Sequence, residues 1–434
     1  MFTDYSEALE WIHGRLKFGV KPGLKRMEWL LEKLDHPEKR MPVIHVAGTN
    51  GKGSTISYLL HMLTEAGYKI GSFTSPYIET FNERISVNGH PITDQEMLAL
   101  VNEVKPLVEN IEVTELGGPT EFEIITTMMY LYFGKYNKPD YLLLETGLGG
   151  RLDSTNIIEP VLSIITNVGY DHMNILGSTI AEIAYEKAGI IKNGVPTITA
   201  VENDQALHVI AEIAENREAN LSVLGKDFTI TNQKLHENGE VFSIQTPFKF
   251  YKDIQLTMRG EHQTKNAALS ITAIDYLVMY KNLKIEEDQI RSGLRKALWK
   301  GRFEQVHENP EVIIDGAHNI EGVESLIETV KRHYPNKKVH FLVSVLKDKD
   351  YEEMIDRLSL IATSMHFTTF EFPRAAKAID LYSVCNLDEK TYSEDWKLIL
   401  ANILNEYKEK KEDIVIILGS LYFISHIREF FKNR

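Results

Sequence analysis

The sequence predicts an α/β protein built from two domains. The chain has 434 residues, which is too long for one hydrophobic core and enough for two. Short apolar runs alternate with helical periodicity from Met41 to about Val201, and a second such alternation starts near Glu311. This alternation is typical of parallel sheets that helices cover. We therefore expect a larger domain over residues 1–297 and a smaller one over 298–434.

Strand and helix signals follow one another through the first domain. Between the strands we expect helices over 52–66, 94–109, 121–136 and 178–189. The candidate strands are apolar and rich in β-branched residues, and they are MPVIHVAG, YKIGSFTS, YLLLETG, VLSIITNVG and VPTITAV. Residues 222–258 instead predict a small patch of antiparallel strands, FTITNQ, VFSIQTP and IQLTMRG. Two helices are expected to follow, at about 262–281 and 286–297.

The second domain repeats the α/β pattern on a smaller scale. Its boundary is expected at residues 297–301, where a helix ends and a glycine allows a bend. The last expected helix contains FISHIREFF. The strands that helical stretches separate are EVIIDGA, KVHFLVSV, SMHFTTFEF and DIVIILGS.

Composition narrows the function classes. The net charge of −14 argues against a nucleic-acid-binding protein, which more often carries a basic excess. There is no apolar run of 18 residues, so no membrane span is expected, and the N-terminus lacks the apolar region of a secretory signal. The single cysteine, Cys385, excludes an internal disulfide and fits a reducing compartment. We expect a cytoplasmic protein that is monomeric.

The most informative segment is IHVAGTNGKGST, residues 44–55, in which an apolar strand turns into a glycine-rich loop and then a helix. This geometry cradles phosphate, because glycines let backbone N–H groups point inward and the helix N-terminus adds partial positive charge. Lys52 would reach the outer phosphates, and Ser54 or Thr55 could offer a hydroxyl to Mg²⁺. The strict P-loop pattern is not met, since Val46 replaces a glycine and Gly53 follows the lysine. A strand-to-helix turn with an incidental lysine is the alternative.

Three further segments place polar residues after strands or on the next helix. Glu145 ends the strand of LLLETGLGGRLDSTN, where ligands gather in parallel sheets, and is a candidate Mg²⁺ ligand or a helix-capping carboxylate. Asp171 and His172 end ITNVGYDH, and His172 could share a divalent ion with Glu145, although Mg²⁺ prefers oxygen. Lys187, in EIAYEKAGIIK, is by its residue type alone an ordinary solvated or ion-paired lysine.

Two segments in the first domain have both a functional and a structural interpretation. In TSPYIETFNERISVNGHPI, Ser75 could place its hydroxyl on a metal, and Arg84 could reach a carboxylate or form a surface ion pair. Asn88-Gly89 there predicts a type I′ hairpin turn. Thr120 begins a predicted helix with Glu123 three residues later, which a capping box explains without any function.

The remaining candidates lie in the second half of the chain. His262 and Asn266 are spaced i, i+4 on one helix face, and Arg302 lies at the domain boundary. Asp315 and His318 follow a strand in VIIDGAHN, and GSLYF repeats a strand-to-helix Gly-Ser turn at the last strand. An asparagine, an arginine and an aspartate of this set could together hold a nucleotide.

These segments together resemble the folylpolyglutamate synthase and dihydrofolate synthase family, relatives of the Mur ligases. The resemblance covers essentially the whole chain, and its blocks occur in the family's order: GTNGKGS, TSPYIETFNERI, ETGLGGRLDSTN, ITNVGYDH, EKAGIIK, HQTKNAALS, KGRFE, DGAHN and GSLYF. The resemblance implies a Mur-ligase-like α/β fold. Its larger domain would be a P-loop ATPase with a mainly parallel sheet and a small antiparallel patch. The C-terminal domain would be Rossmann-like and would form the glutamate side of the cleft.

The resemblance also implies roles for individual residues. Lys52, His172 and Lys187 would be catalytic, and the metal ligands would be Ser75, Glu145, His172 and Lys187, the lysine as N6-carboxylysine. The ATP contacts would be Asn50, Gly51, Lys52, Gly53, Ser54, Thr55, Asn266, Arg302 and Asp315. The pteroate pocket would be lined by Thr120, Glu121, Phe122, Glu123, Leu152, Asp153 and Ser154, with His318 and Ser420 near the incoming glutamate. We add Arg84 as a substrate-binding candidate. Ser154 replaces the family's alanine in RLDATN, a small-for-small change in that pocket.

The implied reaction is ATP-dependent amide formation between L-glutamate and a folate, with dihydropteroate as a further acceptor. ATP, two Mg²⁺ ions and a monovalent cation are the expected cofactors. A Mur-type ligase acting on a UDP-muramoyl acceptor is the nearest alternative, but only about forty residues precede the glycine loop, too few for the nucleotide-sugar domain of such enzymes. An ATP-hydrolysing switch is a more distant alternative, because it would need neither a second metal site nor a second α/β domain.

Overall fold

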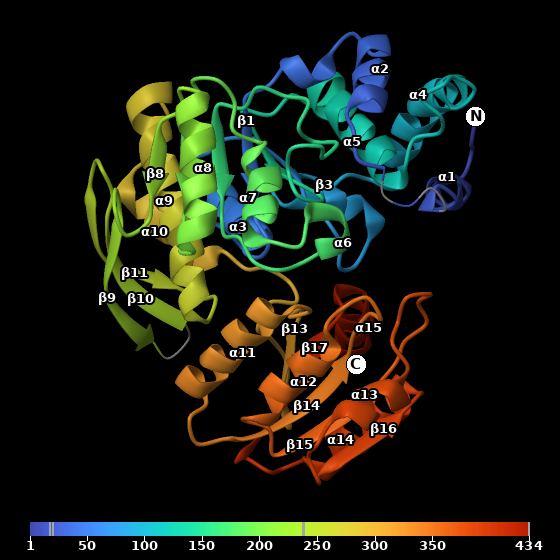
Figure 1. The fold of residues 1–434 in the computed structure, drawn as a ribbon, viewed down its shortest axis with the longest axis vertical. Coiled ribbons are helices and arrows are strands. Elements are labelled where there is room, and N and C mark those ends of the chain that lie inside the picture. Colours follow the sequence, from blue (N-terminus) through green and yellow to red (C-terminus); the bar gives the residue numbers. More distant parts are fainter. Residues whose placement is uncertain (17–18, 20, 237–238, 433–434) are drawn as a thin grey trace. The chain divides into compact units, whose positions relative to one another are not determined.

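The computed structural model describes residues 1–434 except 17–18, 20, 237–238 and 433–434, and it contains two compact units (Figure 1). Unit 1 comprises Met1–Asn232, Phe242–Gln255 and Lys265–Ala297. Unit 2 comprises Gln233–Val241, Leu256–Thr264 and Leu298–Arg434. In the described part of the chain, no helix is both long and apolar enough to cross a membrane.

Unit 1 is built on an eight-stranded sheet. Its strands lie in the spatial order β4 (His90–Pro91), β3 (Ile85–Val87), β2 (Ile70–Phe73), β5 (Tyr141–Glu145), β1 (Val43–Ala47), β6 (Leu162–Ile165), β7 (Thr197–Thr199) and β8 (Leu221–Val223). All neighbouring strands from β2 to β8 run parallel, and β3 and β4 add an antiparallel hairpin. The predicted I′ turn of that hairpin is confirmed, because Asn88 and Gly89 both have positive φ, 49° and 79°. The five predicted parallel strands of this region are all present.

Helices cover the sheet of unit 1. They are α1 (Tyr5–His13), α2 (Lys25–Lys33), α3 (Lys52–Glu65), α4 (Asp94–Glu112), α5 (Glu121–Leu131), α6 (Met173–Leu176), α7 (Ile180–Ala188), α8 (Asp204–Asn216) and α10 (Glu287–Lys296), with α9 (Glu261–Lys281) beginning in unit 2 and continuing in unit 1. A buried core joins α1, α2, α4 and α5 to β1, β2 and β5, and α3 packs against the same strands and against α10. The packing of α10 on α3 is very close, since a Cβ at Gly293 would lie 2.5 Å from the backbone of Met62. The α-helical part of the predicted helix 121–136 is shorter than expected, because the chain continues from Tyr132 to Tyr136 as a short π-helix.

A separate three-stranded sheet has the order β11 (Phe250–Leu256), β10 (Gly239–Gln245) and β9 (Thr229–His236). It corresponds to the small strand patch that the sequence predicts. Its residues are divided between the two units, because 233–241 and 256–264 group with unit 2 and 242–255 with unit 1.

Unit 2 contains a six-stranded sheet with helices on both faces. The order is β12 (Glu304–Glu308), β13 (Glu311–Asp315), β17 (Asp413–Gly419), β14 (Lys338–Ser344), β15 (Ser364–Thr368) and β16 (Lys390–Ser393), and only β12 is antiparallel to its neighbour. Alternate strand residues face α11 (Ile320–His333), α12 (Tyr351–Ser359) and α13 (Ala378–Val384), and the others face α14 (Trp396–Glu406) and α15 (Leu421–Lys432). This arrangement confirms the predicted α/β class for the C-terminal region.

Candidate active site

The glycine-rich loop between β1 and α3 is held on both sides by neighbouring elements of unit 1. Gly51 precedes the first residue of α3 and has φ +83°, and a Cβ there would lie 2.5 Å from Oδ1 of Asn266 on α9. On the other side, Thr166 after β6 donates a hydrogen bond to the carbonyl of Asn50 (2.5 Å), and Asn167 accepts one from the Asn50 N–H (2.8 Å). Only glycine fits at position 51, both for its backbone conformation and for the approach of Asn266.

The strand-to-helix loop places Lys52 at the first turn of α3. Its ammonium group donates to the carbonyl of Gly48 (3.0 Å) and lies 3.9 Å from Oε1 of Glu145. Ser54 is nearly buried and Thr55 is fully buried, and the Thr55 carbonyl accepts a hydrogen bond from Ser270 on α9. Of the two hydroxyls considered for Mg²⁺, that of Thr55 lies in the interior, which favours Ser54.

Glu145 and Ser75 meet at the carboxyl edge of the sheet, because β2 and β5 are parallel neighbours. The Glu145 side chain is 6% exposed, and its Oε2 accepts a hydrogen bond from the Ser75 N–H (3.1 Å). A serine hydroxyl and a carboxylate are both oxygen donors, the kind of ligand that Mg²⁺ prefers, and Ser75 and Glu145 are neighbours here through the serine N–H. The residues present therefore fit the implied ion at this edge.

Lys187 lies at the last turn of α7 and is only 3% exposed. Burial, with a smaller contribution from the charge of Lys52, lowers the pKa of Lys187 to about 7, although Asp171 and Asp153 act in the opposite direction. His172 is in the left-handed region (φ 50°), and its Nε2 lies 3.8 Å from Oδ1 of Asp171. Among the described residues, no three His, Cys, Asp or Glu side chains are grouped to hold a metal ion. A metal at this position would need Lys187 as an anion, which fits only its N-carboxylated form.

The loop from 147 to 156 is held in shape by the carboxylate of its own Asp153. Asp153 accepts hydrogen bonds from the Leu148 N–H (2.7 Å), the Thr155 N–H (3.0 Å) and the Thr155 hydroxyl (2.6 Å), and burial raises its pKa. Thr155 also pairs with Nε2 of His45 in β1 (2.8 Å). The structure therefore gives Asp153 a loop-shaping role, and Leu152 and Ser154 are its neighbours on the same loop.

The segment Thr120–Glu123 begins α5, and the predicted capping box between Thr120 and Glu123 is present. Glu121 accepts from Arg84 (3.1 Å) and lies 3.2 Å from Nδ1 of His13, while Glu123 accepts from Arg26 (2.8 Å). Arg84 is thus a buried ion-pair partner of Glu121, not the surface ion pair considered as its alternative. Phe122 packs below the 147–156 loop, where a Cβ at Gly147 would lie 2.5 Å from its ring.

The N-terminal residues that join these two segments were not predicted from the sequence. Lys21 donates to the carbonyl of Gly118 (3.1 Å), and the Gly23 N–H donates to the carbonyl of Leu152 (3.5 Å). Arg26 adds a bond to the carbonyl of Lys21 (2.9 Å). The only signal in the sequence was a basic, glycine-containing stretch before α2, and such a stretch does not identify its distant partners.

Unit 2 groups four of the predicted residues at the carboxyl edge of its own sheet. Asp315 ends β13 and accepts hydrogen bonds from the N–H groups of Phe303 and Ala317, both at 2.8 Å. Arg302 donates to the carbonyl of Gly316 (3.1 Å), and Nδ1 of His318 lies 2.7 Å from the same oxygen. Ser420 follows the adjacent parallel strand β17.

Comparison with known proteins agrees with this geometry. Residues 46–274 match the Mur ligase middle domain, and residues 301–421 match the Mur ligase, glutamate ligase domain. The chain is 54% identical over 432 residues to the dihydrofolate synthase/folylpolyglutamate synthase of Bacillus subtilis, with 100% of each chain covered. It is 33% identical to the folylpolyglutamate synthase of Lacticaseibacillus casei, with 98% of each chain covered.

Solved structures give the same result. A Mycobacterium tuberculosis folylpolyglutamate synthase complexed with ADP and AMPPCP superposes with a TM-score of 0.91 at 28% identity, covering 99% of each chain. A folylpolyglutamate synthase–AMPPCP–folate complex has a TM-score of 0.86 at 31% identity, again covering 99% of each chain. The chain therefore belongs to the folylpolyglutamate synthase/dihydrofolate synthase family of the Mur ligase superfamily.

Proposed function

We propose that this chain is an ATP-dependent ligase that adds L-glutamate to the γ-carboxylate of tetrahydrofolate and its polyglutamates, and that also converts dihydropteroate to dihydrofolate. The observation that carries the proposal is the glycine loop with Lys52, Glu145 and Ser75 at one sheet edge. It is supported by family relatives whose names contain both activities, and by a similar protein solved with AMPPCP and folate.

The chemistry requires activation of a carboxylate, because a carboxylate oxygen is a poor leaving group. An oxygen of the acceptor carboxylate attacks the γ-phosphorus of ATP, the bond to the β,γ-bridging oxygen breaks, and ADP leaves. The resulting acyl phosphate is attacked at carbon by the neutral amine of glutamate. The tetrahedral intermediate then releases phosphate and a proton to give the amide. The two steps together consume one ATP for each amide bond.

The residues of unit 1 serve the first step by positioning and charge neutralisation. Backbone N–H groups of the glycine loop and the ammonium of Lys52 would bind the phosphates, with Asn266 beside Gly51 as a nucleotide contact. Mg²⁺, held by Ser75 and Glu145, would neutralise phosphate charge. A second Mg²⁺ would need His172 and the carboxylated form of Lys187.

Burial favours carboxylation of Lys187, because carbon dioxide reacts with the neutral amine and a desolvated lysine resists protonation.

The remaining nucleotide and glutamate contacts would come from unit 2, from Arg302, Asp315, His318 and Ser420. The segments 120–123 and 152–154, joined by Lys21–Arg26, would line the pteroate pocket. The monomeric state, the cytoplasmic location and the monovalent cation stay predictions.

A paired assay tests the proposal. Purified protein with ATP, Mg²⁺ and radiolabelled glutamate should give labelled product both with dihydropteroate and with a tetrahydrofolate, and chain length is read by mass spectrometry. Product with a UDP-muramoyl acceptor in place of folate would reassign the substrate. Phosphate release that is indifferent to folate and glutamate would indicate an ATPase without ligase activity.

A further inference from the structure

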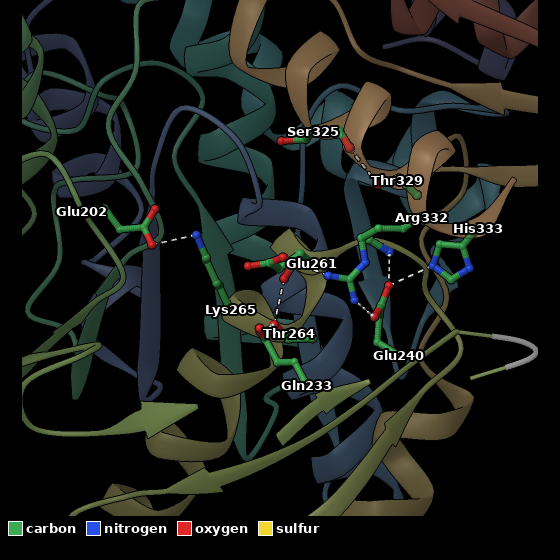
Figure 2. A network of polar contacts seen from close by, with 11 residues as sticks. Glu202, Gln233, Glu240, Glu261, Thr264, Lys265, Ser325, Thr329, Arg332 and His333 are labelled. Atoms are coloured by element: carbon green, nitrogen blue, oxygen red, sulfur yellow. Dashed lines mark hydrogen bonds and ion pairs between the residues drawn. The ribbon is translucent and has the colours of Figure 1, made fainter. Parts of the chain in front are cut away.

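A buried carboxylate in unit 2 joins three elements at the start of α9 (Figure 2). Glu240, in β10, is 0% exposed and accepts hydrogen bonds from Arg332 (2.9 Å) and from the Gly260 N–H (3.0 Å), while its Oε1 lies 2.8 Å from Nε2 of His333. Burial alone would raise the pKa of Glu240, but these partners lower it below its ordinary value. Glu240 is therefore held as an anion between β10, the 256–260 connection and α11.

Arg332 extends this pair to the first turn of α9. Its Nη1 donates to Oε2 of Glu261 (2.9 Å) while its Nη2 binds Glu240, so one guanidinium bridges two carboxylates (Figure 2). Gly260, just before the helix, has φ +109°, and a Cβ there would lie 2.6 Å from the hydroxyl of Thr329 on α11. We call Glu240, Arg332, His333 and Glu261 the Glu240 clamp.

The same helix carries a predicted nucleotide contact a little more than one turn later. Within unit 1, Lys265 pairs with Glu202 (2.7 Å), and Asn266 lies against Gly51 of the glycine loop. Ser270, one turn further, donates to the carbonyl of Thr55 (3.1 Å). The helix is therefore fastened at its first turn by the Glu240 clamp and at its next turns by the loop that would bind phosphate.

A contribution to protein stability alone does not explain the Glu240 clamp. Buried ion pairs are weak contributors to stability, because the cost of desolvating both charges offsets most of their attraction. Their best attested use is to specify one geometry, and a guanidinium that bridges two carboxylates does this more strictly than an ammonium could. The geometry specified here is the position of the first turn of α9.

We infer that the Glu240 clamp is a positioning device: Arg332 and Glu240 hold the first turn of α9, and the helix in turn holds Asn266 against the glycine loop for nucleotide binding. This inference rests on the proposed function, since it assigns Asn266 to the nucleotide. Each clamp residue acts through α9 and not by contact with substrate.

Glu261→Ala tests the inference with little risk to folding, because this side chain is 41% exposed. Glu324→Ala is the matched control, since Glu324 is 46% exposed and also accepts from an arginine, Arg357, at 2.9 Å. We expect Glu261→Ala to weaken AMPPCP binding by about fivefold in calorimetry and to raise KM for ATP to the same extent. KM for glutamate should stay unchanged, and Glu324→Ala should match the wild type.

Arg332→Lys provides a second variant, because lysine keeps the charge but cannot bridge both carboxylates. It should weaken AMPPCP binding at least as much, and adding Glu261→Ala to it should weaken binding no further. Wild-type AMPPCP affinity in both variants would overturn the inference, as would a lowered Tm with unchanged nucleotide affinity. Binding of AMPPCP needs neither folate nor glutamate. A wild-type protein that binds AMPPCP but forms no amide would therefore refute the proposed function and leave the test of the clamp intact.

Discussion

The carboxyl edge of the unit 1 sheet and the amino edge of the unit 2 sheet both gather side chains of the kinds that enzymes use. The strand-end cluster of unit 1 consists of Lys52, Ser75, Glu145, Asp171 and Lys187. The histidine cluster of unit 2 consists of His340, Ser364, His366, Tyr407 and Asp413. By residue type alone, the histidine cluster has the more familiar catalytic composition.

The geometry of the histidine cluster also resembles an acid–base–nucleophile set. Nε2 of His340 lies 2.7 Å from Asp413, and its Nδ1 lies 2.8 Å from the hydroxyl of Ser364. However, that hydroxyl also pairs with His366 (3.0 Å) and Tyr407 (3.3 Å), and all of these groups are buried. The cluster lies where β14, β15 and β17 begin, at the edge opposite to that where parallel sheets bind ligands. Its hydrogen-bonding capacity is used internally.

The strand-end cluster of unit 1 differs from the histidine cluster because it brings charged side chains together at the carboxyl edge of its sheet. Burial and then the charge of Lys52 lower the pKa of Lys187 to about 7, so this lysine loses its proton more readily than an ordinary one. Glu145 lies 3.9 Å from the ammonium of Lys52, beyond hydrogen-bond distance. Desolvating charged groups beside the glycine loop costs stability, and such a cost is typical of a functional site. The comparison teaches that position on the sheet identifies a site better than residue type does.

The comparison is tested most severely by Lys52→Ala. Removing this ammonium should lower kcat for glutamate addition by about a thousandfold, because it takes away charge stabilisation at the transferring phosphoryl group. Radiolabelled glutamate incorporation measures the loss, and thermal unfolding should show a Tm close to that of the wild type. Activity near the wild-type level would remove the phosphate role of the loop.

Lys187→Ala should have the next largest effect. If the carboxylated lysine binds metal, its loss should lower kcat by about a hundredfold. Because a buried lysine is costly to desolvate, the free energy of unfolding should not fall. In the wild-type protein, ¹³C-labelled bicarbonate should give a carbamate signal by NMR that the variant lacks, and absence of that signal would exclude carboxylation.

Ser364→Ala should affect stability and leave catalysis unchanged. The substitution leaves His340, His366 and Tyr407 each without one hydrogen-bond partner, and should cost about 3 kcal/mol in the free energy of unfolding. Urea denaturation measures this cost. A loss of kcat at a temperature where the variant is fully folded would show that the histidine cluster is a site after all.

The smallest effect that we expect is the contribution of His366 to the pH dependence of unfolding. Burial, followed by the charge of His340, lowers the pKa of His366 to about 4, and burial also lowers that of His340. Both are neutral in the folded protein but take up protons when unfolded below pH about 6.5, so stability falls as the pH drops from about 6.5 toward 4. His366 alone should cost about 2 kcal/mol at pH 5.

Urea denaturation at pH 7 and pH 5 measures this dependence. His366→Asn should remove its share of this dependence, and a variant with the wild-type slope would show that His366 does not contribute to it. Because unit 1 also holds a buried neutral histidine, His45, a residual slope is expected in this variant.

Much of the fold could be predicted because the same local strand and helix patterns recur along the sequence. The alternation of apolar strands with amphipathic helices predicts both sheets, and the Asn88-Gly89 turn and the Thr120–Glu123 capping box depend only on neighbouring residues. The N-terminal helices α1 and α2 do not alternate with strands in the sequence, and they were not predicted. The partners of Glu121 and Glu123, which are Arg84, His13 and Arg26, come from distant segments.

The amino-acid sequence by itself determined where the glycine-rich loop lies and which strands lead to it, because glycine spacing and strand periodicity are local properties. Only the tertiary structure decided which polar side chains are used in folding. It showed Asp153 bonded within its own loop, Arg84 paired with Glu121 and His340 enclosed by its cluster, and it placed Lys52 3.9 Å from Glu145 at the carboxyl edge of the sheet. The physical reason is that a polar group's partners are set by contacts between residues far apart in the chain, and no local pattern records them.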